Sequence, residues 1–184
     1  MSLGLYITRW RHHKGFGVHS PFAFSLIADI TGKPGSYYGD DRLREQIGNR
    51  HGTMRRQAWL LHRLIARIDP TAVIIPKEMP EAFTIAATIA RTDRAPISEI
   101  PKPMPRDFMI VASPDYLQEN ADKVIEALSH SGNTLVVFGR RRIADDLLAR
   151  MRKSMPGGWA LIDSKTAVLI SSTQSHYMEY QVRL

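Results

Sequence analysis

The sequence predicts an α/β fold, in which a mostly parallel sheet is covered by helices and follows a small helical extension. From residue 71 onward, short apolar segments alternate with amphipathic segments, which is typical of parallel strands joined by crossover helices. Residues 1–69 contain amphipathic segments but no comparable strands. We therefore expect an N-terminal basic helical extension over residues 1–69 and an α/β domain over residues 70–184.

The composition is that of a globular chain. Of its 184 residues 43% are hydrophobic, and no apolar run approaches the about 18 residues that a membrane-spanning helix needs. The apolar stretch at the N-terminus is too short for a signal peptide. Cysteine is absent, which excludes disulfides, thiolate metal sites and a cysteine nucleophile. We expect a cytoplasmic protein without a membrane partner.

The formal charge of +7 is concentrated in the first third of the chain. Residues 1–67 hold eleven Lys and Arg against four acidic residues, whereas residues 68–184 hold fourteen of each. Such asymmetry predicts an acidic partner for the first third, either nucleic acid or another protein. A solubilising face on a helical extension is the simpler explanation.

Three helices are expected in the extension. Ser20 supplies a hydroxyl cap and Pro21 a first helical position, so one helix begins here and should end near Gly32. "DDRLREQI" predicts a short polar helix. The third helix runs from about Met54 to Ile68, with apolar residues at helical spacing. Four arginines are expected mostly on its opposite face: Arg55, Arg56, Arg63 and Arg67.

The second part alternates strands and helices. "AVII", "FMIVA" and "NTLVVFG" are predicted buried strands, and "APISEI" a weak one. Helices are expected at "PEAFTIAATIAR", over residues 115–130 as one helix, and at "IADDLLARMRKSM". "WALID" and "AVLIS" are too close for a crossover helix, so they should form an antiparallel hairpin at the edge of the sheet. "YMEYQVRL" contains a further candidate strand.

Several of these segments resemble one enzyme family. "GFGVHSPFAFSLIADI" and "YYGDDRLREQI", followed by a basic helix, resemble an N-terminal extension of some bacterial class I S-adenosylmethionine-dependent methyltransferases, and "HSPF" is the most specific element. "DFMIVASPDY", "NTLVVFG" and the closing hairpin continue the resemblance. It implies a Rossmann-like methyltransferase fold. Only about fifteen residues separate Arg91 from Asp107, so the fold should be shortened by about one strand-helix unit.

The resemblance is weakest where the cofactor would bind. It implies an acidic residue and a glycine-rich turn after the first strand, because only glycine lets the backbone come close to a ligand. This chain instead has Pro76, Lys77 and Glu78 there. Glu99 is either a remaining acceptor for ribose hydroxyls or an exposed loop residue. Ser113 stands where metal-dependent relatives often place an aspartate. These five residues are candidate vestigial cofactor positions, and no catalytic residue, cofactor or metal is expected.

A second group of candidates is cationic. Arg140, Arg141 and Arg142 lie at or just before a predicted helix N-terminus, where each cation costs about 0.3–1 kcal/mol. Because helix N-termini also bind phosphate, such a conflict indicates an anion or partner site, together with Arg55 and Arg56. Neutralisation by Asp145 and Asp146 is the simpler explanation.

Three functions follow from these observations. The first is a degenerate methyltransferase-like protein that binds no S-adenosylmethionine and acts as a binding or scaffolding module, as a homodimer or with another protein. The second is an active S-adenosylmethionine-dependent methyltransferase with an atypical pocket that uses Glu99. The third is a nucleic-acid-binding module that uses the basic N-terminal third.

Overall fold

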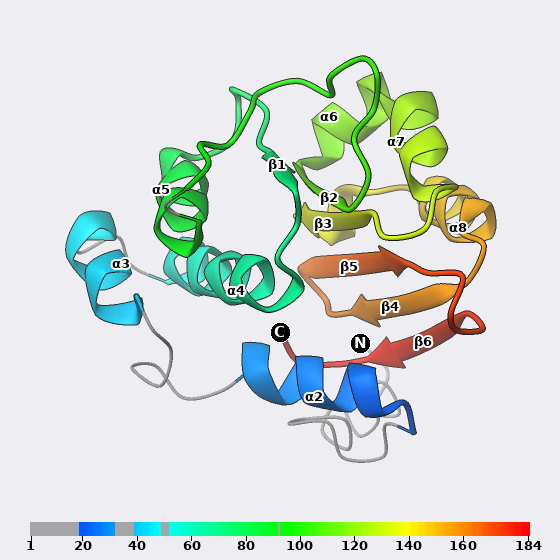
Figure 1. Ribbon diagram of the computed structural model, residues 1–184, viewed down its shortest axis with the longest axis horizontal. Coiled ribbons are helices and arrows are strands. Elements are labelled where there is room, and N and C mark those ends of the chain that lie inside the picture. The colour runs from blue at the N-terminus through cyan, green and yellow to red at the C-terminus, as the bar shows by residue number, and fades with distance from the viewer. Residues whose placement is uncertain (1–18, 32–38, 49–51, 92) are drawn as a thin grey trace.

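The computed structural model describes residues 19–31, 39–48, 52–91 and 93–184. Within them a twisted six-stranded sheet lies between helices on both faces (Figure 1). The segments "GFGV" and "YY" of the methyltransferase resemblance lie outside the described residues. None of the helices in the described ranges is long and apolar enough to cross a membrane.

The sheet is mixed and mostly parallel, as predicted. Its strands are β1 (Ala72–Ile74), β2 (Phe108–Ala112), β3 (Thr134–Phe138), β4 (Gly158–Ile162), β5 (Thr166–Ser171) and β6 (Met178–Gln181). Their order is β1-β2-β3-β5-β4-β6. Only β5 runs antiparallel to its neighbours, β3 and β4. The carboxyl ends of β1, β2, β3 and β4 therefore meet at one edge of the sheet, which we call the carboxyl edge.

The β4–β5 hairpin forms as expected, but its predicted position at the edge of the sheet is wrong. β5 inserts between β3 and β4, and β6 pairs in parallel with β4 as the outer strand. Burial explains this order. All residues of β5 are buried, which suits a strand with neighbours on both sides, whereas β6 is only partly buried.

The weak strand in "APISEI" is reduced to a single bridge beside β1. The amide of Ile97 donates to the carbonyl of Val73 at 2.9 Å, and the amide of Ile75 donates to the carbonyl of Ile97 at 2.8 Å.

Helices cover both faces of the sheet. On one face lie α2 (Pro21–Ile30), α4 (Thr53–Ile68) and α5 (Glu81–Ala90), and their apolar side chains share one core with the sheet. α3 (Asp40–Ile47) packs outside them against α5 and α4. The other face carries α6 (Pro114–Glu119), α7 (Ala121–Leu128) and α8 (Asp145–Ser154).

The single helix expected over residues 115–130 is two helices, which meet at Asn120. Its backbone leaves the helical region (φ −119°, ψ 21°), and its side-chain amide donates to the carbonyl of Tyr116 at 3.2 Å. Asparagine bonds its own backbone in this way and thereby competes with helix continuation.

Arg63 is buried, which corrects its expected place on the polar face of α4. Its guanidinium donates to Asp40 at 2.9 Å and to the carbonyl of Ile30 at 3.4 Å. The neighbouring His62 is also buried, with Nδ1 3.8 Å from the other carboxylate oxygen of Asp40. The pattern of α4 alone missed this because α2 and α3 cover a side of the helix that local periodicity assigns to solvent.

Ser20 caps α2, as expected, and also connects it to the sheet. Its hydroxyl oxygen accepts from the amide of Ala23 at 3.3 Å and from the indole of Trp159, on β4, at 3.1 Å. The ring of Phe22 packs against the same indole, with 4.3 Å between ring centroids. The "HSPF" segment thus contains both the cap and the contact that hold α2 on the sheet.

Replacement of Ser20 by alanine should cost more than loss of a cap. We expect Ser20→Ala to lower the free energy of unfolding by about 1.5–3 kcal/mol, because a cap contributes about 1 kcal/mol and the indole also loses its acceptor. Ser113→Ala is the matched control, since Ser113 caps α6 through one bond to Tyr116. Chemical denaturation measures both variants, and equal losses would contradict the second role of Ser20.

His62 should make stability depend on pH. Burial lowers the pKa of His62, Arg63 lowers it further, and Asp40 partly opposes them. The folded state therefore disfavours protonation, and its stability is highest above the unfolded pKa of about 6.5 and falls as the pH drops below it. We expect the stability difference between wild type and His62→Gln to fall by up to about 1.4 kcal/mol per pH unit below that value. Denaturant unfolding between neutral and mildly acidic pH measures the difference, and a constant value would refute this assignment.

Candidate functional site

A turn of bulky residues follows β1 at the carboxyl edge. The amide of Met79 donates to the carbonyl of Pro76 at 3.0 Å, so Lys77 and Glu78 occupy the corner of a closed turn. Pro76 and Met79 are buried, whereas Lys77 and Glu78 are exposed. The turn therefore presents two charged side chains where a glycine-rich turn would present backbone.

The Ile97 bridge brings a second segment beside this turn. Because Ile97 is bonded to β1, the following residues 98–100 lie at the carboxyl end of that strand. Glu99 thereby comes close to the Lys77–Glu78 corner, although more than twenty residues separate them in sequence.

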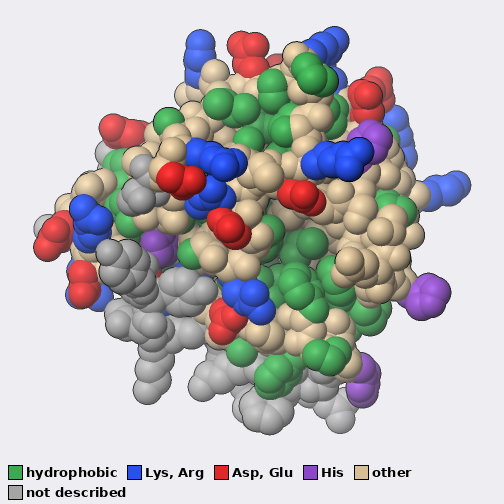
Figure 2. Space-filling view, in the orientation of Figure 1, with side chains coloured by type: hydrophobic (Ala, Val, Ile, Leu, Met, Phe, Trp, Pro, Cys, Tyr) green, Lys and Arg blue, Asp and Glu red, His purple; other side chains and the backbone are tan. Residues whose placement is uncertain are grey.

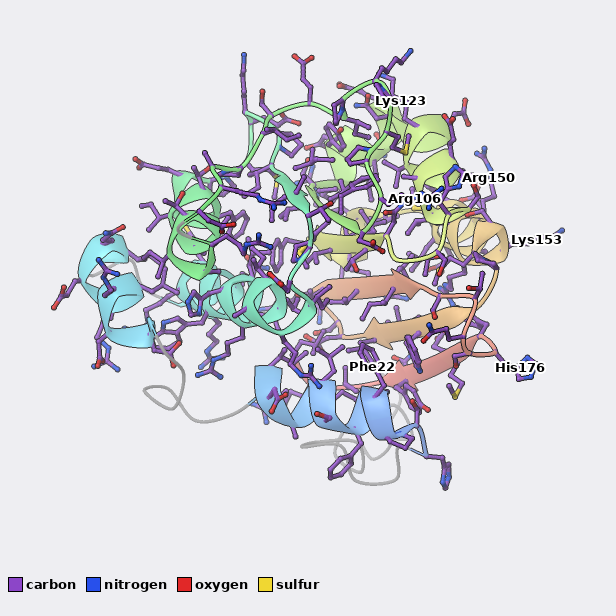
Figure 3. The ribbon with its side chains drawn as sticks, viewed as in Figure 1. Phe22, Arg106, Lys123, Arg150, Lys153 and His176 are labelled. Atoms are coloured by element: carbon purple, nitrogen blue, oxygen red, sulfur yellow. The ribbon has the colours of Figure 1, made fainter. Side chains whose placement is uncertain are left out.

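The third wall comes from α6 and the start of α7. The hydroxyl of Ser113 accepts from the amide of Tyr116 at 3.1 Å and starts α6 directly after β2. Asn120 at the junction of the helices accepts from the ammonium of Lys123 at 3.3 Å. Figure 3 shows Lys123 on α7 beside the loop that leads from α5 to β2.

These three segments enclose a pocket of about 320 Å³, which we call the carboxyl-edge pocket. Its lining residues are Pro76, Lys77, Glu78, Ser98, Glu99, Ile100, Tyr116, Glu119, Asn120 and Lys123. The volume is at the lower end of the range for small-molecule sites, about 300–1,000 Å³. Acidic and basic side chains lie close together along this upper rim of the molecule (Figure 2).

Tyr116 is the one polar ring in this lining. Burial raises the pKa of its phenol, and the carboxylates of Glu78 and Glu99 raise it further. Tyr116 is therefore protonated at neutral pH and can donate a hydrogen bond to a ligand. It is not suited to act as a base or a nucleophile, because both roles require the deprotonated form.

Four of the five candidate cofactor positions line one pocket: Pro76, Lys77, Glu78 and Glu99. The fifth, Ser113, caps α6 instead of lining it. Sequence reasoning missed Tyr116, Glu119, Asn120 and Lys123. The signal available was the Ser113-Pro114 helix start directly after a buried strand, which places the first turn of α6 at the carboxyl edge.

The turn after β1 lacks the glycine-rich sequence that the resemblance implies for S-adenosylmethionine binding. No glycine occurs between residues 71 and 90, so each backbone position of the turn after β1 carries a side chain. Three carboxylates and two ammonium groups are among the side chains that border the pocket. Within the described part of the chain, no group of three histidine or acidic residues is arranged to hold a metal ion.

The candidate cations lie elsewhere on the carboxyl edge. Arg140–Arg142 form a short 3₁₀ turn after β3 that ends before α8 begins. Arg142 pairs with Asp115 on α6 at 2.8 Å, so Asp145 and Asp146 are not its partners as expected. Arg55 lies over the ring of Trp59 at 5.0 Å, and Arg56 is exposed on the first turns of α4.

Comparison of this chain with protein-family models, with curated proteins and with solved structures gives no match.

The pocket geometry predicts how Tyr116 titrates. We expect the double substitution Glu78→Gln and Glu99→Gln to lower the pKa of Tyr116 toward the usual value of about 10, because two nearby negative charges are removed. NMR titration with ring-labelled tyrosine measures this, and Tyr116→Phe identifies the signal. Glu126→Gln, on the exposed side of α7 and outside the pocket lining, should leave the titration unchanged. An unchanged pKa of Tyr116 in the double variant would show that Glu78 and Glu99 do not lie close to Tyr116.

Proposed function

We propose that this chain is a degenerate methyltransferase-like protein, which binds no S-adenosylmethionine and acts as a binding or scaffolding module. The observation that carries the proposal is the turn after β1, where Lys77 and Glu78 stand at the mouth of the pocket. A nucleoside cofactor at this edge needs close approach to the backbone, and these side chains occupy that space.

The sheet supports the methyltransferase part of the proposal. Parallel β1, β2 and β3 followed by an antiparallel β4–β5 hairpin is the arrangement that the sequence resemblance implies. The single Ile97 bridge, with no helix described between Asp93 and Asp107, fits the loss of one strand-helix unit.

The other strand ends support the degenerate part. The hydroxyl of Ser113, after β2, is used as a helix cap. β3 is followed by Gly139 and three arginines rather than by a carboxylate. Tyr116, whose pKa is raised by burial and by Glu78 and Glu99, stays in its neutral form and is not suited to act as a general base near neutral pH.

One observation favours the second candidate, an active methyltransferase with an atypical pocket. Glu99 lines the pocket and lies close enough to Tyr116 to affect its pKa, so it could accept hydrogen bonds from a diol there. This function requires methyl transfer that disappears in Glu99→Ala while the fold is retained.

Calorimetric titration with S-adenosylmethionine and S-adenosylhomocysteine tests the proposal. We expect no saturable heat and no thermal shift up to about 1 mM ligand, which corresponds to a binding free energy weaker than about 4 kcal/mol. An active class I methyltransferase in the same buffer is the positive control. Saturable binding in the micromolar range would overturn the proposal. Methyl transfer would then be measured in wild type and in Glu99→Ala.

A further inference from the structure

Lys165 connects three segments that lie far apart in the sequence. It sits in the β4–β5 turn, and its carbonyl accepts from the amides of Gly139 at 2.8 Å and Arg140 at 3.0 Å. Its ammonium donates to the hydroxyl of Thr53, the first residue of α4, at 3.3 Å. The start of α4, the arginine turn after β3 and the β4–β5 turn therefore adjoin one another at the carboxyl edge.

The three segments of this junction contribute five cations to the carboxyl edge. Arg56 lies three residues after Thr53, so it stands on the side of α4 that faces Lys165. Arg141 and Lys165 are exposed, and Arg140 and Arg55 are partly exposed. We call Arg55, Arg56, Arg140, Arg141 and Lys165 the cationic surface.

No carboxylate in the described part of the chain neutralises the charge of the cationic surface by an ion pair. In the described ranges, none of its five residues forms an ion pair with a carboxylate. The nearby Asp115 is already paired with Arg142, and Asp163 is buried. Asp145 and Asp146 start α8 without pairing to either exposed arginine of the turn.

Two further features suit an anionic ligand with bases. Arg55 and Arg56 lie in the first turns of a 16-residue helix that has no acidic residue and no side-chain cap there, so the helix dipole adds to their positive field. Arg55 also covers the ring of Trp59, and a guanidinium held over an aromatic ring offers its outer face for stacking.

We propose that the cationic surface binds single-stranded nucleic acid, with phosphates on Arg56, Arg140, Arg141 and Lys165 and a base stacked on Arg55. Arginine dominates the set, and its planar fork matches phosphate oxygens. These cations come from three segments, α4, the turn after β3 and the β4–β5 turn, which suits an extended backbone rather than one small anion. This inference goes beyond the proposed function and does not depend on cofactor loss.

Fluorescence anisotropy with a labelled single-stranded RNA of about 16 nucleotides tests the proposal. Four phosphate contacts give a slope of log affinity against log salt of about −2.8, or an about 50-fold loss of affinity between about 50 and 200 mM salt. We expect each double substitution, Arg55→Glu with Arg56→Glu or Arg140→Glu with Arg141→Glu, to weaken binding at least about tenfold and to flatten the slope.

A matched control separates this surface from net charge. Arg106→Glu with Lys153→Glu makes the same charge change at exposed positions that precede β2 and end α8, at the opposite edge of the sheet (Figure 3). This control should retain most of the affinity. Two milder double variants remove the charge without reversing it: Arg55→Gln with Arg56→Gln, and Arg140→Gln with Arg141→Gln. Their RNA affinity tests the cationic surface if charge reversal perturbs folding.

Three results would overturn the proposal. They are absence of RNA binding at low salt, equal weakening in the control variant, and equal affinity for polyglutamate, which carries charge but neither phosphates nor bases. Binding of S-adenosylmethionine in the calorimetric experiment would leave this surface unaffected, so the two proposals fail independently.

Discussion

The structure depends on one buried charge. The side chain of Arg63, on α4, is buried. Its guanidinium donates hydrogen bonds to the carboxylate of Asp40 on α3 and to the carbonyl of Ile30, the last residue of α2. A guanidinium at this depth is costly unless it is paired and hydrogen-bonded. α4 can therefore pack on the sheet only with α2 and α3 in place around it. The first described helices thus share one core with the sheet.

This constraint also determines what the carboxyl edge presents. α4 ends at Ile68 and is followed after three residues by β1, and its N-terminus lies at the carboxyl edge beside the β4–β5 turn. Thr53 meets Lys165 there. The helix that secures the N-terminal segments is therefore the same one that places Arg55 and Arg56 beside the strand ends.

Local patterns in the sequence predicted the elements well where the signal is itself local. Caps such as Ser20 and runs such as "FMIVA" gave the correct helices and strands. Candidates chosen because they follow the carboxyl ends of predicted strands include four residues that line one pocket. The order of β5 and β6, the break at Asn120 and the burial of Arg63 depend on which surfaces neighbouring elements cover. Single-segment periodicity does not contain that information.

The cations that can bind an anionic ligand are those without an ion pair to a carboxylate, and the charge counted along the sequence does not identify them. Residues 68–184 carry no net charge, yet within the described ranges Arg140, Arg141 and Lys165 form no ion pair with a carboxylate, and the nearby Asp115 pairs with Arg142. The sequence placed the whole excess in the first third, whereas the cationic surface combines both parts.

The two sites on the carboxyl edge favour different ligands. Asp115 precedes Tyr116 of the pocket in the sequence, and Arg142 follows Arg141 of the cationic surface. Asp115 and Arg142 form an ion pair, so a neutral pair adjoins both the pocket and the cationic surface. On one side three glutamates outnumber the two lysines of the pocket, which disfavours a phosphate, and on the other five cations attract it. A single-stranded nucleic acid bound at Lys165 is therefore expected to run along α4 and away from the pocket. The pocket is left to a small ligand that tolerates mixed charge.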